Sequence, residues 1–162
     1  MSNNMQMYQI FDQSFLDVTD KVASIRLERL TEENVLADCP VAVEILTKGL
    51  FCSDIVCKMS NELFEAIIQN MNRGKEVAAD ERTLYIGEYM NIVCGQALSD
   101  INNRVGRGSR LSIPKVTVGE SESRMDNQKS SIELYYDTSY GKMKVIVSYE
   151  IQNQHKEVEK TV

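Results

Sequence analysis

The strongest constraint on the fold is that helical and strand-like spacings of apolar residues occupy separate parts of the chain. Apolar residues recur every three or four positions near the start, after residue 60, and between about residues 80 and 105. Strand-like runs, separated by turns, lie at 41–59 and 132–149. Since hairpins and helices are segregated in this way, the pattern predicts an α+β fold, a two-layer sandwich with a mixed or antiparallel sheet and helices on one face.

Caps and turns place the first half of these elements. The first helix carries the apolar stripe Phe11, Phe15, Val18, Val22 and Ile25. A strand at 41–46, a turn at 47–49 and a return strand at 51–59 predict a hairpin. Ser60 is a good N-cap for the second helix, which the residues 72–74 end. The stripe of this helix is Leu63, Phe64, Ile67, Ile68 and Met71.

The second half is predicted in the same way. The third helix is expected from about Asp80 to Val105, where Gly106 and Gly108 stop it. Pro114 leads into a strand at 115–118, and a polar loop follows at 119–130. The two final strands alternate apolar with polar residues, with Ile132, Leu134 and Tyr136 in one and Met143, Val145, Val147 and Tyr149 in the other.

Composition limits the size and the partners of the protein. The 162 residues, 43% of them hydrophobic, fit a single domain over residues 1–162. The net charge of −6 disfavours nucleic acid as a partner, because binding phosphates requires a basic surface. No run of apolar residues is long enough to span a membrane, and the first residues do not resemble a secretory signal, so we expect a cytoplasmic protein.

The sulfur and imidazole groups offer little chemistry. The cysteines form no Cys-x-x-Cys pair and are expected to be buried, reduced thiols at positions Cys39, Cys52, Cys57 and Cys94. The single histidine, His155, lies in a polar tail, so no metal site is expected. A hydrolase with a histidine base is disfavoured for the same reason.

The third helix has two contrasting faces. The stripe expected to pack on the sheet consists of Ile86, Met90, Val93, Ala97 and Ile101. The opposite side carries Glu88, Asn91, Gly95, Ser99 and Asn102. A solvent-facing surface is normally polar, so the spacing alone leaves an ordinary exposed face as one interpretation. Gly95 favours a second interpretation, in which the face is a smooth patch where another backbone can approach closely. Glycine within a helix lowers helix stability by about 1 kcal/mol relative to alanine, so its presence here suggests such a use.

One motif resembles a known family. Glu88-x-x-Asn91, followed after 22 residues by Pro114, resembles the signature of the CheC/CheX/FliY chemotaxis phosphatases. The stretches GEYMNIVCGQALSDI and IPKVTVG, with Gly95 and Gly119, are most similar to the CheX-like branch. The element order matches that family over nearly the whole chain. A single Glu-x-x-Asn is similar to CheX-type proteins, whereas CheC-type proteins have two.

The resemblance implies a function and a site. It implies a protein-aspartate phosphatase that hydrolyses the aspartyl phosphate of a CheY-like response regulator in chemotaxis or related two-component signalling. Asn91 would position the attacking water, and Glu88 would pair with the active-site lysine of the receiver domain. Gly95 and Ser99 would lie at the partner contact, while Pro114 would shape the entry to its strand. The receiver is expected to bind Mg²⁺, so this chain needs no cofactor or metal of its own.

Two further expectations follow from the family. Its CheX branch commonly forms homodimers through sheet edges, for which the strands from Ile132 to Tyr149 could supply an edge. The family usually has Asp or Ser four residues before the glutamate, where this chain has Leu84, which could pack at the start of the helix. That departure keeps an alternative open, a non-catalytic module that binds a receiver domain through the same helix.

Overall fold

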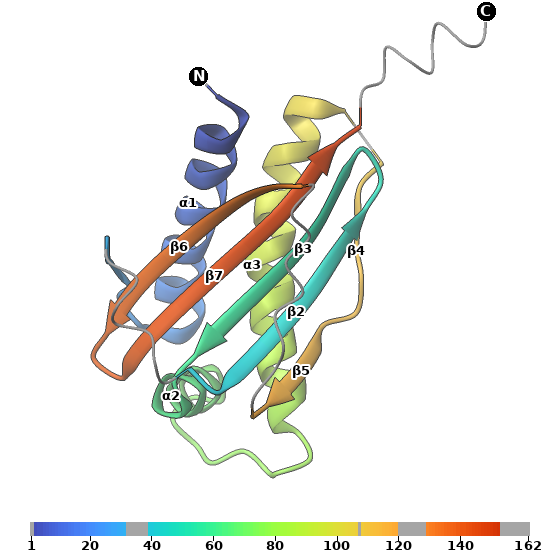
Figure 1. The fold of residues 1–162 in the computed structure, drawn as a ribbon. Helices are drawn as coiled ribbons and strands as arrows, with labels where there is room; N and C mark the ends of the chain where they lie inside the picture. Colours follow the sequence, from blue (N-terminus) through green and yellow to red (C-terminus); the bar gives the residue numbers. More distant parts are fainter. Residues whose placement is uncertain (1, 32–38, 107, 120–128, 153–162) are drawn as a thin grey trace, which may run out of the picture.

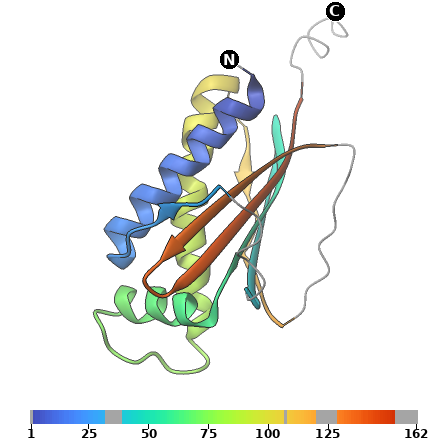
Figure 2. The same ribbon diagram turned by 60° about the vertical axis from the view of Figure 1, so that its left-hand side comes forward.

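A computed structural model describes residues 2–31, 39–106, 108–119 and 129–152, and in it helices cover one face of a sheet (Figures 1 and 2). The helices in these ranges are α1 (Asn3–Ala23), α2 (Asn61–Met71) and α3 (Arg82–Val105). The strands are β1 (Glu28–Arg29), β2 (Val41–Lys48), β3 (Phe51–Met59), β4 (Arg110–Leu111), β5 (Lys115–Val118), β6 (Ser130–Thr138) and β7 (Gly141–Ile151). The predicted α+β class with helices on one face is confirmed.

The sheet has the strand order β1-β6-β7-β3-β2-β4, and its paired strands are antiparallel. β5 also pairs with β2, so β4 and β5 lie along the same outer side of that strand. The two-residue strands β1 and β4 were not predicted, because two residues carry no detectable period. β7 pairs with both β3 and β6, so of the two final strands only β6 has an edge that is partly unpaired among the described residues. Of the strands from Ile132 to Tyr149, which were expected to supply an edge, β7 is internal to the sheet, so that part of the expectation was wrong.

Strand register decides which side chains face the helices. Alternate residues of β3, from Phe51 to Met59, are buried and point into the helical layer. The stripes predicted for α1 and α2 are largely buried there too, except that Val22 and Met71 are only partly covered. Ile25 is buried but lies outside α1, which ends at Ala23 because Ser24 adopts a left-handed conformation. Ser60 is the predicted N-cap of α2, its hydroxyl accepting a hydrogen bond from the Leu63 amide at 3.2 Å.

The thiols are less uniform than the sequence indicated. All four cysteines are reduced, but only Cys57 and Cys94 are buried, whereas Cys39 and Cys52 are partly covered. Burial raises the pKa of the Cys94 thiol from 9.0 to about 12, so this group stays protonated and unreactive near neutral pH. Across the described ranges, no cluster of three or more His, Cys, Asp or Glu could hold a metal ion. His155 lies outside those ranges.

Candidate functional site

The two faces of α3 are arranged as its sequence predicts. Every residue of the expected inner stripe is completely buried: Ile86, Met90, Val93, Ala97 and Ile101. On the other side Glu88 and Ser99 are exposed, while Asn91, Gly95 and Asn102 are partly exposed. The side chains of Glu88 and Asn91 have no hydrogen-bond or ion-pair partner among the described residues. Both polar groups are therefore available to another molecule.

Buried hydrogen bonds to α1 fix the rotation of α3 about its axis. The hydroxyls of Tyr89 and Thr19 lie 2.6 Å apart, and both residues are fully buried. Ser14 Oγ donates to the backbone carbonyl of Val93, also at 2.6 Å. Turning α3 would leave these buried polar groups without hydrogen-bond partners, and each unsatisfied group would lower the stability of the fold by about 1–3 kcal/mol. Because Tyr89 follows Glu88 in the chain, these contacts hold the Glu88 and Asn91 face outward. The spacing of residues along the sequence gave no signal for these hydrogen bonds between α1 and α3, because they depend on where α1 packs.

The chain that follows α3 returns along its polar face. Asn102 Nδ2 donates to the carbonyl of Ser109 at 3.4 Å, where the return begins. A Cβ placed on Gly95 would lie 3.9 Å from Leu111 Cδ1, and one placed on Gly87 would lie 3.7 Å from the Pro114 ring. The return segment, which we define as residues 109–114, therefore contacts α3 one turn before and one turn after Asn91. Figure 1 shows the chain passing from α3 through β4 to β5 at this edge of the sheet.

The structure gives positions to three further predicted site residues, two of them through these contacts. Pro114 packs against α3 at Gly87, next to Glu88, and directly precedes β5. Gly95 is partly buried beside Leu111, so it is not the entirely uncovered patch that the helical spacing indicated. Ser99 is exposed one turn beyond it. Glu88, Asn91, Gly95 and Ser99 thus share one face of α3, and Pro114 borders it.

Two exposed apolar side chains adjoin this face. Leu84 is 69% exposed, so the expectation that it packs at the start of the helix was wrong. Ile113, in the return segment, is 89% exposed. The sequence reasoning passed over Ile113, although an isolated apolar residue directly before a proline lies outside the alternation of the following strand. Its position beside α3 could not have been inferred from that signal.

Glu88 is exposed and Asn91 partly exposed on α3, and two hollows of the described structure lie elsewhere. One hollow, of about 610 Å³, lies between α1 and residues 26–29. Another, of about 490 Å³, lies between α2 and the residues that lead into α3. Neither is lined by Glu88 or Asn91. Small-molecule sites are normally concave and bury most of their ligand, so this face suits contact with another macromolecule.

The fold and this helix face define a class of α+β proteins that carry a Glu-x-x-Asn motif on the outward face of a helix. The family model for the chemotaxis phosphatase CheX matches residues 41–137, which is more than half of the chain and includes Glu88, Asn91 and Pro114. The chain belongs to the CheX family. No curated protein sequence matches it at a significant level. None of the described helices is long and apolar enough to cross a lipid bilayer.

Solved structures share the fold over almost their entire length. A chemotaxis protein CheX from Desulfovibrio desulfuricans is 18% identical with a TM-score of 0.77, covering 90% of this chain and 99% of its own. A chemotactic CheC-like protein from Shewanella oneidensis is 25% identical with a TM-score of 0.69, covering 91% and 99%. The CheX-CheY-BeF₃-Mg²⁺ complex from Borrelia burgdorferi matches at 14% identity and a TM-score of 0.69, covering 91% and 98%.

Proposed function

We propose that this protein is a phosphatase that removes the aspartyl phosphate from a CheY-like receiver domain in chemotaxis. The observation that carries the proposal is the pair Glu88 and Asn91, held outward on α3 without partners in the described structure. Membership of the CheX family supports the reaction class. The Borrelia burgdorferi relative was solved with CheY, BeF₃ and Mg²⁺, which supports a receiver as the partner.

The proposed chemistry needs little from this chain. An aspartyl phosphate is an activated acyl phosphate, so its hydrolysis depends mainly on placing water in line with the phosphorus. The Asn91 carboxamide can accept a hydrogen bond from that water and donate one to a phosphoryl oxygen. As the water oxygen bonds to phosphorus, the bond between phosphorus and the aspartate oxygen breaks. The products are a free carboxylate and inorganic phosphate.

Glu88 acts in docking rather than in the bond change. Its carboxylate lies one turn before Asn91, where it can form a charge-assisted hydrogen bond with the active-site lysine of the receiver. That pairing would fix the depth and the angle at which Asn91 enters the receiver. The receiver's carboxylates bind Mg²⁺, which offsets negative charge on the phosphoryl group. The described residues of this chain offer no such cluster of carboxylates.

A phosphate-release assay tests the proposal directly. Each receiver encoded in the same genome is phosphorylated, and the loss of phosphate is followed with and without this protein. At least one receiver should lose phosphate faster in its presence. If none does, while one binds only when phosphorylated, the second candidate is favoured, a non-catalytic receiver-binding module. The exposed Leu84, where the family usually has Asp or Ser, is the observation behind that candidate.

Replacing Gly95 with alanine should separate stability from docking. The added methyl would lie 3.9 Å from Leu111, an ordinary contact, so the native fold accepts it. We expect the free energy of unfolding in urea to rise by about 0.5–1 kcal/mol, because alanine favours helices over glycine. If the partner approaches closely here, KM should rise severalfold. An unchanged KM would show that Gly95 does not lie at the contact.

The oligomeric state and the location are also proposals. A homodimer could form through the edge of β6, which pairs with β1 only at Tyr136 and Asp137 within the described residues. The Leu30 amide also donates to the Tyr135 carbonyl at 2.8 Å, so within the described residues the part of this edge left for another strand is 130–134. Light scattering at micromolar concentration should give twice the monomer mass, and a monomer mass would contradict the proposal. A cytoplasmic location follows if the substrate is a receiver domain.

A further inference from the structure

We propose that Leu84 and Ile113 form an apolar contact with the phosphorylated receiver and set the affinity of this protein for it. The inference rests on the proposed function, since it names further residues for the same partner. We call these two side chains the apolar flank. Neither belongs to the Glu-x-x-Asn motif, and neither takes part in the reaction.

The exposure of the apolar flank has no explanation within the described structure. Among the described residues, Ile113 at 89% and Leu84 at 69% are the most exposed large apolar side chains. Isolated exposed apolar residues are common, so exposure alone decides nothing. What distinguishes this pair is its position around Asn91.

Leu84 lies in line with Asn91 on α3. Their separation of seven positions places Leu84 about 10 Å from Asn91 along the helix axis and only about 20° away around it. Glu88 lies between the two along the axis. A surface that contacts Glu88 and Asn91 along this line reaches Leu84 if it extends one further turn toward the start of α3.

Ile113 lies in the return segment, which passes beside Asn91. Leu111 packs beside Gly95 and Pro114 beside Gly87, so Ile113 lies between contacts that bracket Asn91 along α3. Leu111 is partly buried there, whereas Ile113 is almost fully exposed. The return segment thus holds Ile113 next to the turn of α3 that carries Asn91.

The reach of Asn91 determines how close the receiver must come. An asparagine side chain extends only a few ångströms from its helix, so the receiver surface must close onto the surrounding residues for the carboxamide to enter its active site. A specific interface buries roughly 800 Å² on each partner, equivalent to a disc about 16 Å in radius. Leu84, about 10 Å from Asn91 along the axis, lies inside such a disc. The receiver would therefore bury it.

The chemistry of the apolar flank indicates what the receiver must offer. Apolar side chains gain affinity by burial, with little dependence on salt, while Glu88 supplies the charged contact. The cognate receiver should have an apolar surface beside its phosphorylation site. A receiver with charged residues there should bind weakly, so the apolar flank would select among receivers.

The test uses Leu84→Gln and Ile113→Gln, with Met5→Gln as a matched control. Met5 is also an exposed apolar residue on a helix, with 53% of its surface exposed. It lies near the first residue of α1, at the other end of the helical layer from the start of α3 in Figure 1. Glutamine is a good helix former, so the variants in α1 and α3 should fold. Dissociation constants are measured for the full chain with the BeF₃-loaded receiver, and kcat and KM with the phosphorylated one.

Each flank variant should raise the dissociation constant and KM about tenfold, because burying one such side chain gives roughly this factor. The kcat at saturating receiver should stay within about twofold, and the control should leave all three unchanged. Unchanged binding in both flank variants would overturn the inference. So would loss of the dimer in light scattering, because the flank would then contact a second copy of this chain.

The two proposals fail in different ways. If the wild-type protein releases no phosphate from any receiver, the phosphatase proposal fails. Binding to the BeF₃-loaded receiver still tests the apolar flank in that case. Conversely, a normal kcat with flank variants that bind normally would leave the phosphatase intact and remove only the role of Leu84 and Ile113.

Discussion

Replacing Asn91 with alanine should lower kcat for receiver dephosphorylation by about 100-fold or more, with little change in binding. Removing one preorganised hydrogen-bonding group from a reacting centre typically costs 10²–10³ in kcat. Asn91 is partly exposed and has no partner in the described structure, so its loss leaves no buried group unsatisfied. Single-turnover phosphate release at saturating enzyme measures the effect on the chemical step.

Gln96→Ala is the matched control for that substitution. Gln96 is another carboxamide on α3, it is exposed, and it lies about 140° around the axis from Asn91. Its replacement should leave kcat and KM unchanged. Asn91→Asp is a second probe, because it keeps the shape but brings a negative charge toward the phosphoryl group, and it should be as slow as Asn91→Ala. Full activity in Asn91→Ala would refute the proposed mechanism.

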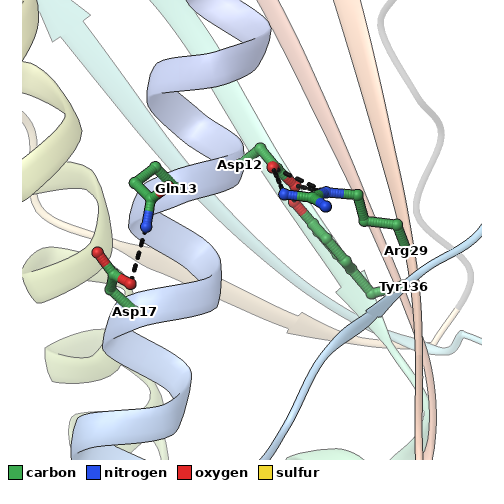
Figure 3. Close-up of polar contacts among 5 residues, drawn as sticks. All are labelled: Asp12, Gln13, Asp17, Arg29 and Tyr136. Carbon is green, nitrogen blue, oxygen red and sulfur yellow. Dashed lines mark hydrogen bonds and ion pairs between the residues drawn. The ribbon is translucent and has the colours of Figure 1, made fainter.

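Replacing Asp12 with alanine should lower the free energy of unfolding by about 2–3 kcal/mol. Asp12 is buried in α1, where it accepts a hydrogen bond from the Tyr136 hydroxyl at 2.7 Å (Figure 3). Arg29 donates to the same carboxylate through Nε and Nη2, closest at 2.6 Å. Burial and this hydrogen bond raise the pKa of Tyr136, so its hydroxyl stays protonated and needs an acceptor.

The expected loss of stability in Asp12→Ala depends on how well Arg29 and Tyr136 can do without the carboxylate. Removing one partner of a fully buried ion pair costs about 3–5 kcal/mol. Here the Arg29 side chain is 57% exposed and can return to water, so the main cost is the unpaired Tyr136 hydroxyl. Asp12→Asn retains an acceptor and should lose less. Urea unfolding of the three proteins measures the differences, and equal stability of Asp12→Ala and wild type would contradict this account.

The same comparison separates stability from function. Asp12 joins α1 to β1 and β6, whereas Ser14 and Thr19 of α1 bind α3. If Asp12 only anchors α1, the folded variant should keep the wild-type kcat at a temperature well below its unfolding transition. Asp12 and the two hydroxyls thus tie α1 both to the sheet and to α3, which carries the candidate site.

Much of the candidate site could be predicted because a helix has a fixed period. The division of α3 into a buried stripe from Ile86 to Ile101 and a polar face with Glu88 and Asn91 depends only on 3.6 residues per turn. The Ser60 cap and the stop at Gly106 were likewise predictable, since capping is decided by neighbours within a few residues. The alternation of β6 and β7 indicated strands, but gave no information about their order.

The sequence by itself therefore determined the three helices and the longer strands, the class of fold and the face on which Glu88 and Asn91 lie. Only the tertiary structure decided that β7 is internal, that Leu84 is exposed, and that residues 109–114 return beside Asn91. These features depend on contacts between residues far apart in the chain, such as Tyr89 with Thr19 and Gly87 with Pro114. Local periodicity cannot encode such contacts, because they follow from how complete elements pack against one another.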